Sequence, residues 1–160
     1  MSVHKKKRYI VVLLTVCILC AVFFAMYKRQ NYIPSRIITA VDQRCSGEGE
    51  CSIDLAEVFT GFDWDTVSIF MAGNTRQIED ALGVYTEISD GIVFSKDGDP
   101  VLTHMSFYQF PQDVPADISY YVHREKPNDP YYVSLPFQNA IVHAEKYMYN
   151  DDYKYTIYAD

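Results

Sequence analysis

The residues of this chain that could carry chemistry are three histidines, a pair of aspartates and two loop cysteines. His104, His123 and His143 could each act as a general base. None of them stands in a motif with serine or cysteine that would make it part of a nucleophilic site. The chain also contains no Gly-x-Ser-x-Gly turn and no phosphate-binding glycine loop. The sequence therefore offers candidate bases without a recognisable reaction.

Asp63 and Asp65 flank Trp64, the only tryptophan of the chain. One interpretation is an acid pair or cation site, which needs a cleft that separates the two pKa values. The other is that the indole fills the core where a strand begins, while the carboxylates stay in water or accept backbone N–H groups. We favour the second, because no third cation ligand accompanies the pair. Asp63, Trp64 and Asp65 are nevertheless candidate binding residues.

Cys45 and Cys51 flank a short loop that contains two glycines. We predict that they form a small structural disulfide, which implies an oxidising compartment. A zinc site is the alternative, but it needs two further ligands, and the Cys-x-x-Cys spacing is absent. We expect no metal and no cofactor.

Tyrosines are concentrated at the C-terminal end, with nine of the fourteen between Tyr120 and Tyr158. Exposed tyrosines suit recognition of proteins or sugars, because they offer contact area and a hydroxyl at low entropic cost. Strand propensity explains the same enrichment without any binding role. Tyr147, Tyr149 and Tyr155 are our candidate binding residues in this region.

These residues must be positioned by strands and one clear helix. Residues 66–72 are rich in strand formers, and a helix follows, capped by Asn74 with Gln77 as the capping-box partner. Ile78, Ala81 and Leu82 give it an apolar stripe, and Gly83 ends it. Later segments read as follows: a turn at 88–91, a strand at 92–95, a hairpin turn at 96–99, a return strand at 101–110 and a strand at 118–122.

The chain ends in a predicted hairpin of residues 140–149 and 153–158. A helix over 137–149 is the competing prediction, since the apolar pattern there is ambiguous. The sum is an α+β fold, a small domain of antiparallel sheet with one short helix packed on it.

Residues 9–27 contain no charge, and nineteen residues of helix span roughly 28 Å, which matches a bilayer core. We predict a single-pass transmembrane helix rather than a cleaved signal peptide, because no small-x-small site follows the apolar run. More basic residues precede this segment than follow it, so the N-terminus should face the cytoplasm. The predicted address is the bacterial inner membrane, with the C-terminal domain periplasmic or extracellular.

The predicted organisation has four parts. Residues 1–8 are a basic cytoplasmic tail, 9–27 the transmembrane helix, 28–41 a stalk in which Pro34 disfavours helix, and 42–160 the extracytoplasmic domain. Residues 30–160 hold 8 basic and 21 acidic residues, a formal net charge of −13. Such a charge opposes binding to nucleic acid and leaves proteins, cations or neutral ligands as partners.

Phe62-Asp63-Trp64-Asp65-Thr66-Val67-Ser68-Ile69-Phe70, the capped helix that ends at Gly83, and the Lys-Asp-Gly hairpin after Phe94 carry a resemblance. Over residues 45–110 the chain resembles small bacterial exported proteins that have an N-terminal anchor or lipoprotein signal and a compact α+β domain. The resemblance implies a fold and an address, and it implies no assigned activity.

Two function classes follow from these observations. The first is a membrane-anchored, non-catalytic binding or accessory module that recognises a protein partner, with an immunity-like or envelope-assembly role. The second is an extracytoplasmic hydrolase that uses His104 or His143 with a carboxylate. A pocket that brings a histidine to Asp63 or Asp65 would favour the hydrolase, and an aromatic sheet face would favour the binding module.

Overall fold

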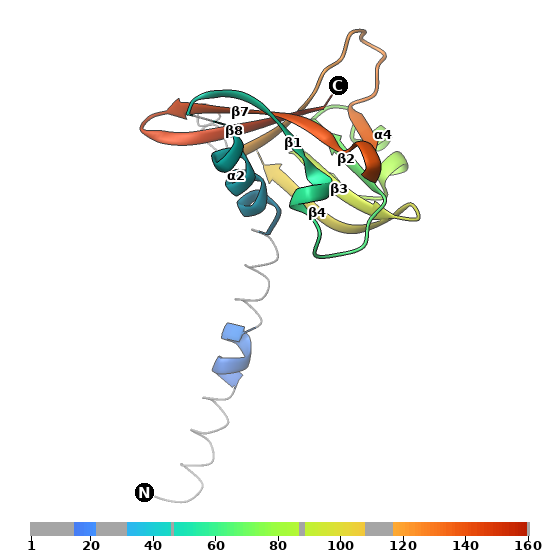
Figure 1. Cartoon of the computed structure of the whole chain (residues 1–160). Helices are drawn as coiled ribbons and strands as arrows, with labels where there is room; N and C mark the ends of the chain where they lie inside the picture. Colours follow the sequence, from blue (N-terminus) through green and yellow to red (C-terminus); the bar gives the residue numbers. More distant parts are fainter. Residues whose placement is uncertain (1–14, 22–31, 46, 87–88, 108–116, 160) are drawn as a thin grey trace, which may run out of the picture. The chain divides into compact units, whose positions relative to one another are not determined.

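The computed structural model describes residues 15–21, 32–45, 47–86, 89–107 and 117–159 (Figure 1). The chain divides into two compact units, Met1–Tyr32 and Ile33–Asp160. In the first unit, residues 15–21 are helical. Most of the predicted transmembrane segment lies outside the described residues, and within those residues no helix is both long enough and apolar enough to cross a bilayer.

The second unit is an α+β fold of two four-stranded sheets with few helices. The first sheet has the order β1 (Gly49–Asp54), β7 (Ile141–Tyr149), β8 (Asp152–Ala159) and β5 (Ile118–Val122). The predicted C-terminal hairpin is confirmed, with Asn150 and Asp151 at positive φ in its turn, and the competing helix is excluded. The strand at 118–122 is also confirmed, but it pairs with β8 in parallel.

The second sheet is antiparallel throughout, in the order β4 (Asp99–Phe107), β3 (Ser89–Lys96), β2 (Thr66–Phe70) and β6 (Tyr132–Pro136). The predicted turn at 88–91 is wrong for the part described, because β3 already begins at Ser89. Gly91 is needed for packing: a Cβ there would lie 2.5 Å from the carbonyl oxygen of His104 and from the ring of Phe70. A glycine that reads as a turn signal is here a site of close approach.

The predicted short helix is confirmed as α4 (Thr75–Leu82). Asn74 accepts the N–H of Gln77 at 3.2 Å, and Gly83 ends the helix in the left-handed conformation. Ile78 and Leu82 pack on Phe70 and Val93 of the second sheet. The apolar stripe is wrong at one position, because Ala81 is exposed.

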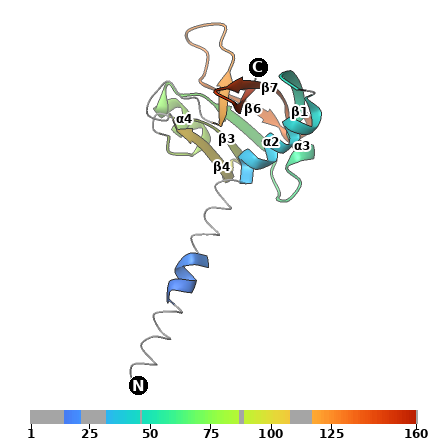
Figure 2. The same cartoon turned by 90° about the vertical axis from the view of Figure 1, so that its left-hand side faces the viewer.

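The predicted stalk is wrong for residues 32–41, which belong to a helix, α2 (Tyr32–Arg44), of the folded unit. Ile33, Ile37 and Val41 are completely or almost completely buried. Pro34 lies within α2, so the prediction that it disfavours helix in this segment is wrong. Figure 2 shows α2 beside α3 (Leu55–Val58).

The predicted disulfide between Cys45 and Cys51 is present, with 5.5 Å between the Cα atoms. It joins the end of α2 to β1, whose first two residues, Gly49 and Glu50, belong to the predicted loop. β5 packs against β2 and β3, so the two sheets share one core. The large side chains buried in that core are Phe59, Phe94, Ile53, Ile69, Ile92 and Ile157.

Candidate functional site

The aspartate–tryptophan motif lines a hollow of about 420 Å³ at the start of β2. We call it the FDWD hollow. Its walls come from the loop before β2, from the end of β3 and from the 3₁₀ turn Phe137–Asn139. The residues that line it are Phe59, Thr60, Phe62, Asp63, Trp64, Asp65, Lys96, Phe137 and Gln138.

Trp64 forms the fixed wall of this hollow. The residue is 4% exposed, and its indole N–H donates to the carbonyl of Phe59 at 2.9 Å. Its ring packs edge-on against Phe94 and Phe137, with centroids 5.0 and 4.7 Å apart. The interpretation that the indole fills the core is therefore confirmed. Phe137, at 38% exposure, carries the aromatic surface out to solvent.

Asp65 is bound into the fold. Its Oδ2 accepts the N–H of Asp97 at 2.8 Å, in the turn between β3 and β4. This hydrogen bond is the main reason that the pKa of Asp65 lies below its ordinary value. Asp65 therefore stays ionised at neutral pH and holds the hairpin turn against the motif.

Asp63 is the accessible carboxylate of the hollow. Its side chain is 81% exposed and lies 3.3 Å from the ammonium group of Lys96. That hydrogen bond is the main reason that the pKa of Lys96 is raised. An acid–base pair of carboxyl groups needs one group that keeps its proton. Asp63 and Asp65 instead each accept a hydrogen bond, Asp63 from the ammonium group of Lys96 and Asp65 from the N–H of Asp97.

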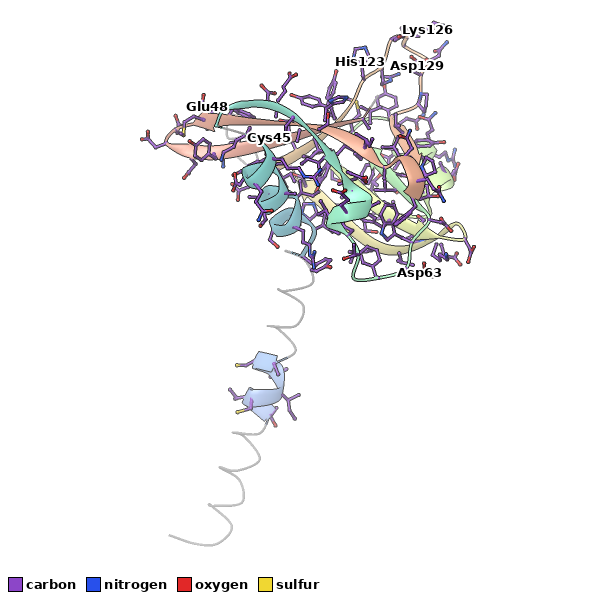
Figure 3. All side chains as sticks on the ribbon, viewed as in Figure 1. Cys45, Glu48, Asp63, His123, Lys126 and Asp129 are labelled. Carbon is purple, nitrogen blue, oxygen red and sulfur yellow. A yellow bond between two sulfur atoms is a disulfide. The ribbon has the colours of Figure 1, made fainter. Side chains whose placement is uncertain are left out.

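The histidines do not supply a base to this pair. No histidine is among the described residues that line the hollow. His104 Nδ1 lies 2.9 Å from the hydroxyl of Tyr120, and His143 Nδ1 lies 3.4 Å from the hydroxyl of Ser52. Figure 3 shows His123 well separated from Asp63. In the described parts of the chain, no three His, Cys, Asp or Glu side chains gather in a way that could hold a metal ion.

The candidate tyrosines divide between the two faces of the first sheet. Tyr147 pairs with Lys154, whereas Tyr155 pairs with Lys146, so Tyr147 and Tyr155 point in opposite directions. Tyr155 is buried, and its hydroxyl donates to Asp42 of α2 at 3.0 Å. Tyr155 therefore serves the packing of α2 and shares no surface with Tyr147.

Tyr147 and Tyr149 lie on the outer face of the first sheet and are partly exposed. The same face carries Tyr158, whose hydroxyl donates to Glu145, and the exposed Tyr121, whose ring lies edge-on to that of Tyr158 at 6.1 Å. An aromatic sheet face of the kind that would favour a binding module is thus present.

A polar cluster that the sequence does not predict lies between the sheets, where the buried Asp90 and Tyr120 meet the half-buried His104. Asp90 accepts the backbone N–H of Tyr120, and burial raises the pKa of Asp90 to about 6. Burial also lowers the pKa of His104 to about 4 and raises that of Tyr120. Asp90 reads locally as a turn residue before a glycine, so no pattern in the sequence signals the cluster.

We compared the chain with models of protein families, with curated proteins and with solved structures, and none of them matches. The resemblance to small exported proteins therefore stays a prediction.

Proposed function

We propose that this chain is a membrane-anchored, extracytoplasmic binding module that performs no catalysis itself and takes a protein partner at the FDWD hollow. The uncharged segment 9–27 is its single-pass anchor, with the N-terminus in the cytoplasm. The Cys45–Cys51 disulfide is consistent with a domain outside the cytoplasm. Immunity against a toxin and service in an envelope assembly both fit such a module.

The observation that carries this proposal is that the hollow combines residues fixed by the fold with residues exposed to solvent. Trp64 and Asp65 are held by the fold, whereas Phe137 and Asp63 present a ring and a carboxylate to solvent. A preformed pocket of this kind loses little entropy on binding, and aromatic residues are the anchors of many interfaces. Gln138 adds an exposed amide at the rim.

Charge indicates the kind of partner. Residues 30–160 carry a formal net charge of −13, which speeds the approach of a basic protein and opposes an acidic one. Asp63 is the group in the hollow that can receive a cationic side chain, because its pair with Lys96 is solvent-exposed and weak. We therefore expect a basic segment of the partner to insert an apolar or cationic side chain beside Phe137.

The hydrolase alternative has less support. It needs a histidine beside an accessible carboxylate, and none of the described residues that line the hollow is a histidine. The ring of His104 bonds to Tyr120 in the polar cluster, and neither residue lines the FDWD hollow.

The test uses the full-length protein purified from membranes with its bound partner. The partner is identified by mass spectrometry, and its affinity is measured by biolayer interferometry against two hollow variants, Phe137→Ala and Asp63→Asn. We expect each variant to weaken binding by about tenfold or more, and the wild-type affinity to fall with added salt.

Matched controls are Ile141→Ala, an exposed apolar residue outside the hollow, and Asp80→Asn, an exposed carboxylate on α4. Both should bind the partner like wild type. Wild-type affinity in both hollow variants would contradict the site. Recovery of the protein in the cytosolic fraction with Cys45 and Cys51 open to alkylation would contradict the address.

A further inference from the structure

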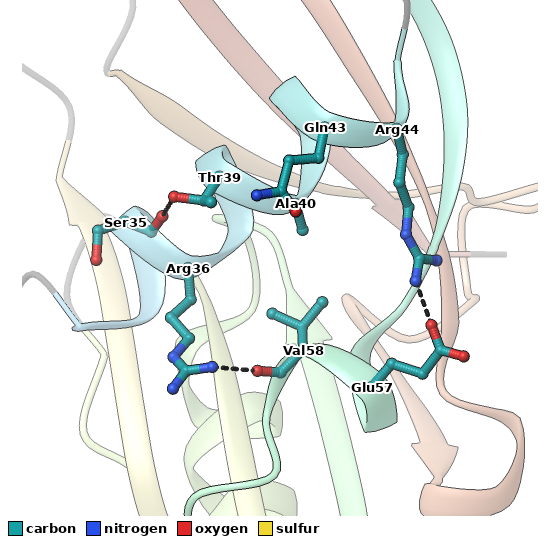
Figure 4. Close-up of a pocket in the computed structure, with 8 residues that line it drawn as sticks. All are labelled: Ser35, Arg36, Thr39, Ala40, Gln43, Arg44, Glu57 and Val58. Atoms are coloured by element: carbon teal, nitrogen blue, oxygen red, sulfur yellow. Dashed lines mark hydrogen bonds and ion pairs between the residues drawn. The ribbon is translucent and has the colours of Figure 1, made fainter.

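A second hollow lies between α2 and α3 and has a different chemical character. It holds about 380 Å³, and Figure 4 shows its walls. We call it the arginine pocket, and its lining residues are Ser35, Arg36, Thr39, Ala40, Gln43, Arg44, Glu57 and Val58.

The pocket is built from one side of α2. Its α2 residues recur at intervals of three and four, so they lie along one face of the helix. Arg36 and Arg44 both extend from that face toward α3 (Figure 4). The guanidinium group of Arg36 donates to the carbonyl of Val58 at 2.9 Å, and that of Arg44 pairs with the carboxylate of Glu57. Contacts with α3 thus hold both cationic groups at the wall.

Two arginines in one pocket stand out in a domain as acidic as this one. Residues 30–160 contain only eight basic residues, and the lysines Lys96, Lys146 and Lys154 each pair with an aspartate. In the arginine pocket, one carboxylate faces two guanidinium groups. The residues that line the pocket therefore carry a formal charge of +1, opposite in sign to the charge of the whole domain.

We infer that the arginine pocket binds the phosphate group of a ligand through Arg36 and Arg44. The planar guanidinium matches phosphate oxygens in a bidentate way that lysine cannot reproduce. Glu57 already shows that an anionic group fits beside Arg44, and it is exchangeable, because the two side chains are 41% and 63% exposed. Gln43 supplies a neutral amide at the same wall.

This phosphate could belong to a soluble phosphate ester or to a phospholipid headgroup. The second source enters because Arg36 follows Tyr27, the end of the predicted anchor, by only nine residues. The two sources share their anionic oxygen atoms and differ in whether the ligand resides in the bilayer.

The first arm measures binding of inorganic phosphate to the full-length protein in a zwitterionic detergent, by isothermal titration calorimetry. Arg36→Gln and Arg44→Gln should each weaken binding by about tenfold or more. Glu57→Gln should strengthen it, because the competing carboxylate is gone. Arg44→Gln and Glu57→Gln remove the same ion pair, so opposite effects on binding separate recognition from any shared loss of stability.

The second arm reconstitutes the protein in nanodiscs of phosphatidylcholine, with and without phosphatidylglycerol. If inorganic phosphate binds more weakly when phosphatidylglycerol is present, the lipid competes for the pocket, and the pocket is assigned to a headgroup. If inorganic phosphate binds equally in both nanodiscs, the pocket is assigned to a soluble phosphate. The matched control is Arg76→Gln, an exposed arginine on α4. No phosphate binding in either arm, or an equal loss in the Arg76 control, would overturn the proposal.

Discussion

The FDWD hollow and the polar cluster contain similar residues, but the pKa values of their aspartates are shifted in opposite directions. Each contains an aspartate beside an aromatic side chain, but the pKa of Asp65 is lowered by the N–H of Asp97, whereas the pKa of Asp90 is raised to about 6 by burial. Asp90 also accepts a backbone N–H, and there the desolvation outweighs it. The balance between hydrogen bonding and desolvation therefore decides which carboxylate stays ionised at neutral pH and which one has its pKa raised inside the core.

Substitution of Trp64 should have the largest effect of all. Its indole is buried against Phe94 and donates a hydrogen bond to the carbonyl of Phe59, so Trp64→Ala leaves a cavity and removes that hydrogen bond. We expect a loss of about 3–5 kcal/mol in the free energy of unfolding, measured by urea denaturation of the full chain. Phe137→Ala, in the same hollow but partly exposed, should cost much less. Equal losses in the two variants would show that the hollow has no fixed wall.

The pH dependence of stability tests the buried cluster. The folded-state pKa of Asp90 lies above its ordinary 3.8, so the folded state binds the proton more tightly, and Asp90 lowers stability as pH rises from about 4 to about 6. The folded-state pKa of His104 lies below its ordinary 6.5, so the folded state binds the proton less tightly, and His104 raises stability from about pH 4 to about 6.5. The two contributions oppose each other, and we expect the wild-type curve to be nearly flat with respect to them.

Single variants should expose each contribution. Asp90→Asn keeps only the contribution of His104, so the stability of this variant should rise by about 3 kcal/mol between pH 4 and pH 6.5. His104→Gln keeps only the contribution of Asp90, so the stability of this variant should fall by about 3 kcal/mol between pH 4 and pH 6. Urea midpoints across this range measure both slopes. Slopes of the same sign in the two variants would refute the assignment of the two pKa shifts.

Elements with local signals could be predicted from the sequence. α4 has a capping residue and a terminal glycine within ten positions, the β7–β8 hairpin has its turn residues between two tyrosine-rich runs, and the disulfide closes a short loop. β1 and β6 could not be found in this way. β1 depends on pairing with β7, about ninety residues later, and β6 on pairing with β2. The parallel pairing of β5 with β8, in which Ile118 pairs with Tyr155, is also non-local.

The candidate sites follow the same division. Asp63, Trp64 and Asp65 were found because they are adjacent in the sequence, and all three line one hollow. The partners that define their roles, Lys96 and Asp97, lie in the predicted hairpin turn, but no local pattern predicts that this turn contacts the motif. Tyr155 was grouped with Tyr147 because both are strand tyrosines, and only the register of β7 against β8 places them on opposite faces.

The smallest stability effects belong to the two aspartates of the hollow, and their order separates their roles. Asp65→Ala removes the acceptor of the Asp97 N–H at a turn where Asp97 and Gly98 both have positive φ, so the melting temperature should fall. Asp63→Ala removes only an exposed ion pair, so the melting temperature should stay close to that of wild type. Partner affinity should respond in the reverse order, with the larger loss at Asp63, because that is the carboxylate we propose to contact the partner. If Asp65→Ala lost more affinity than Asp63→Ala without a fall in melting temperature, Asp65 would be the contact residue, and the division between fixed and presented groups in the hollow would be wrong.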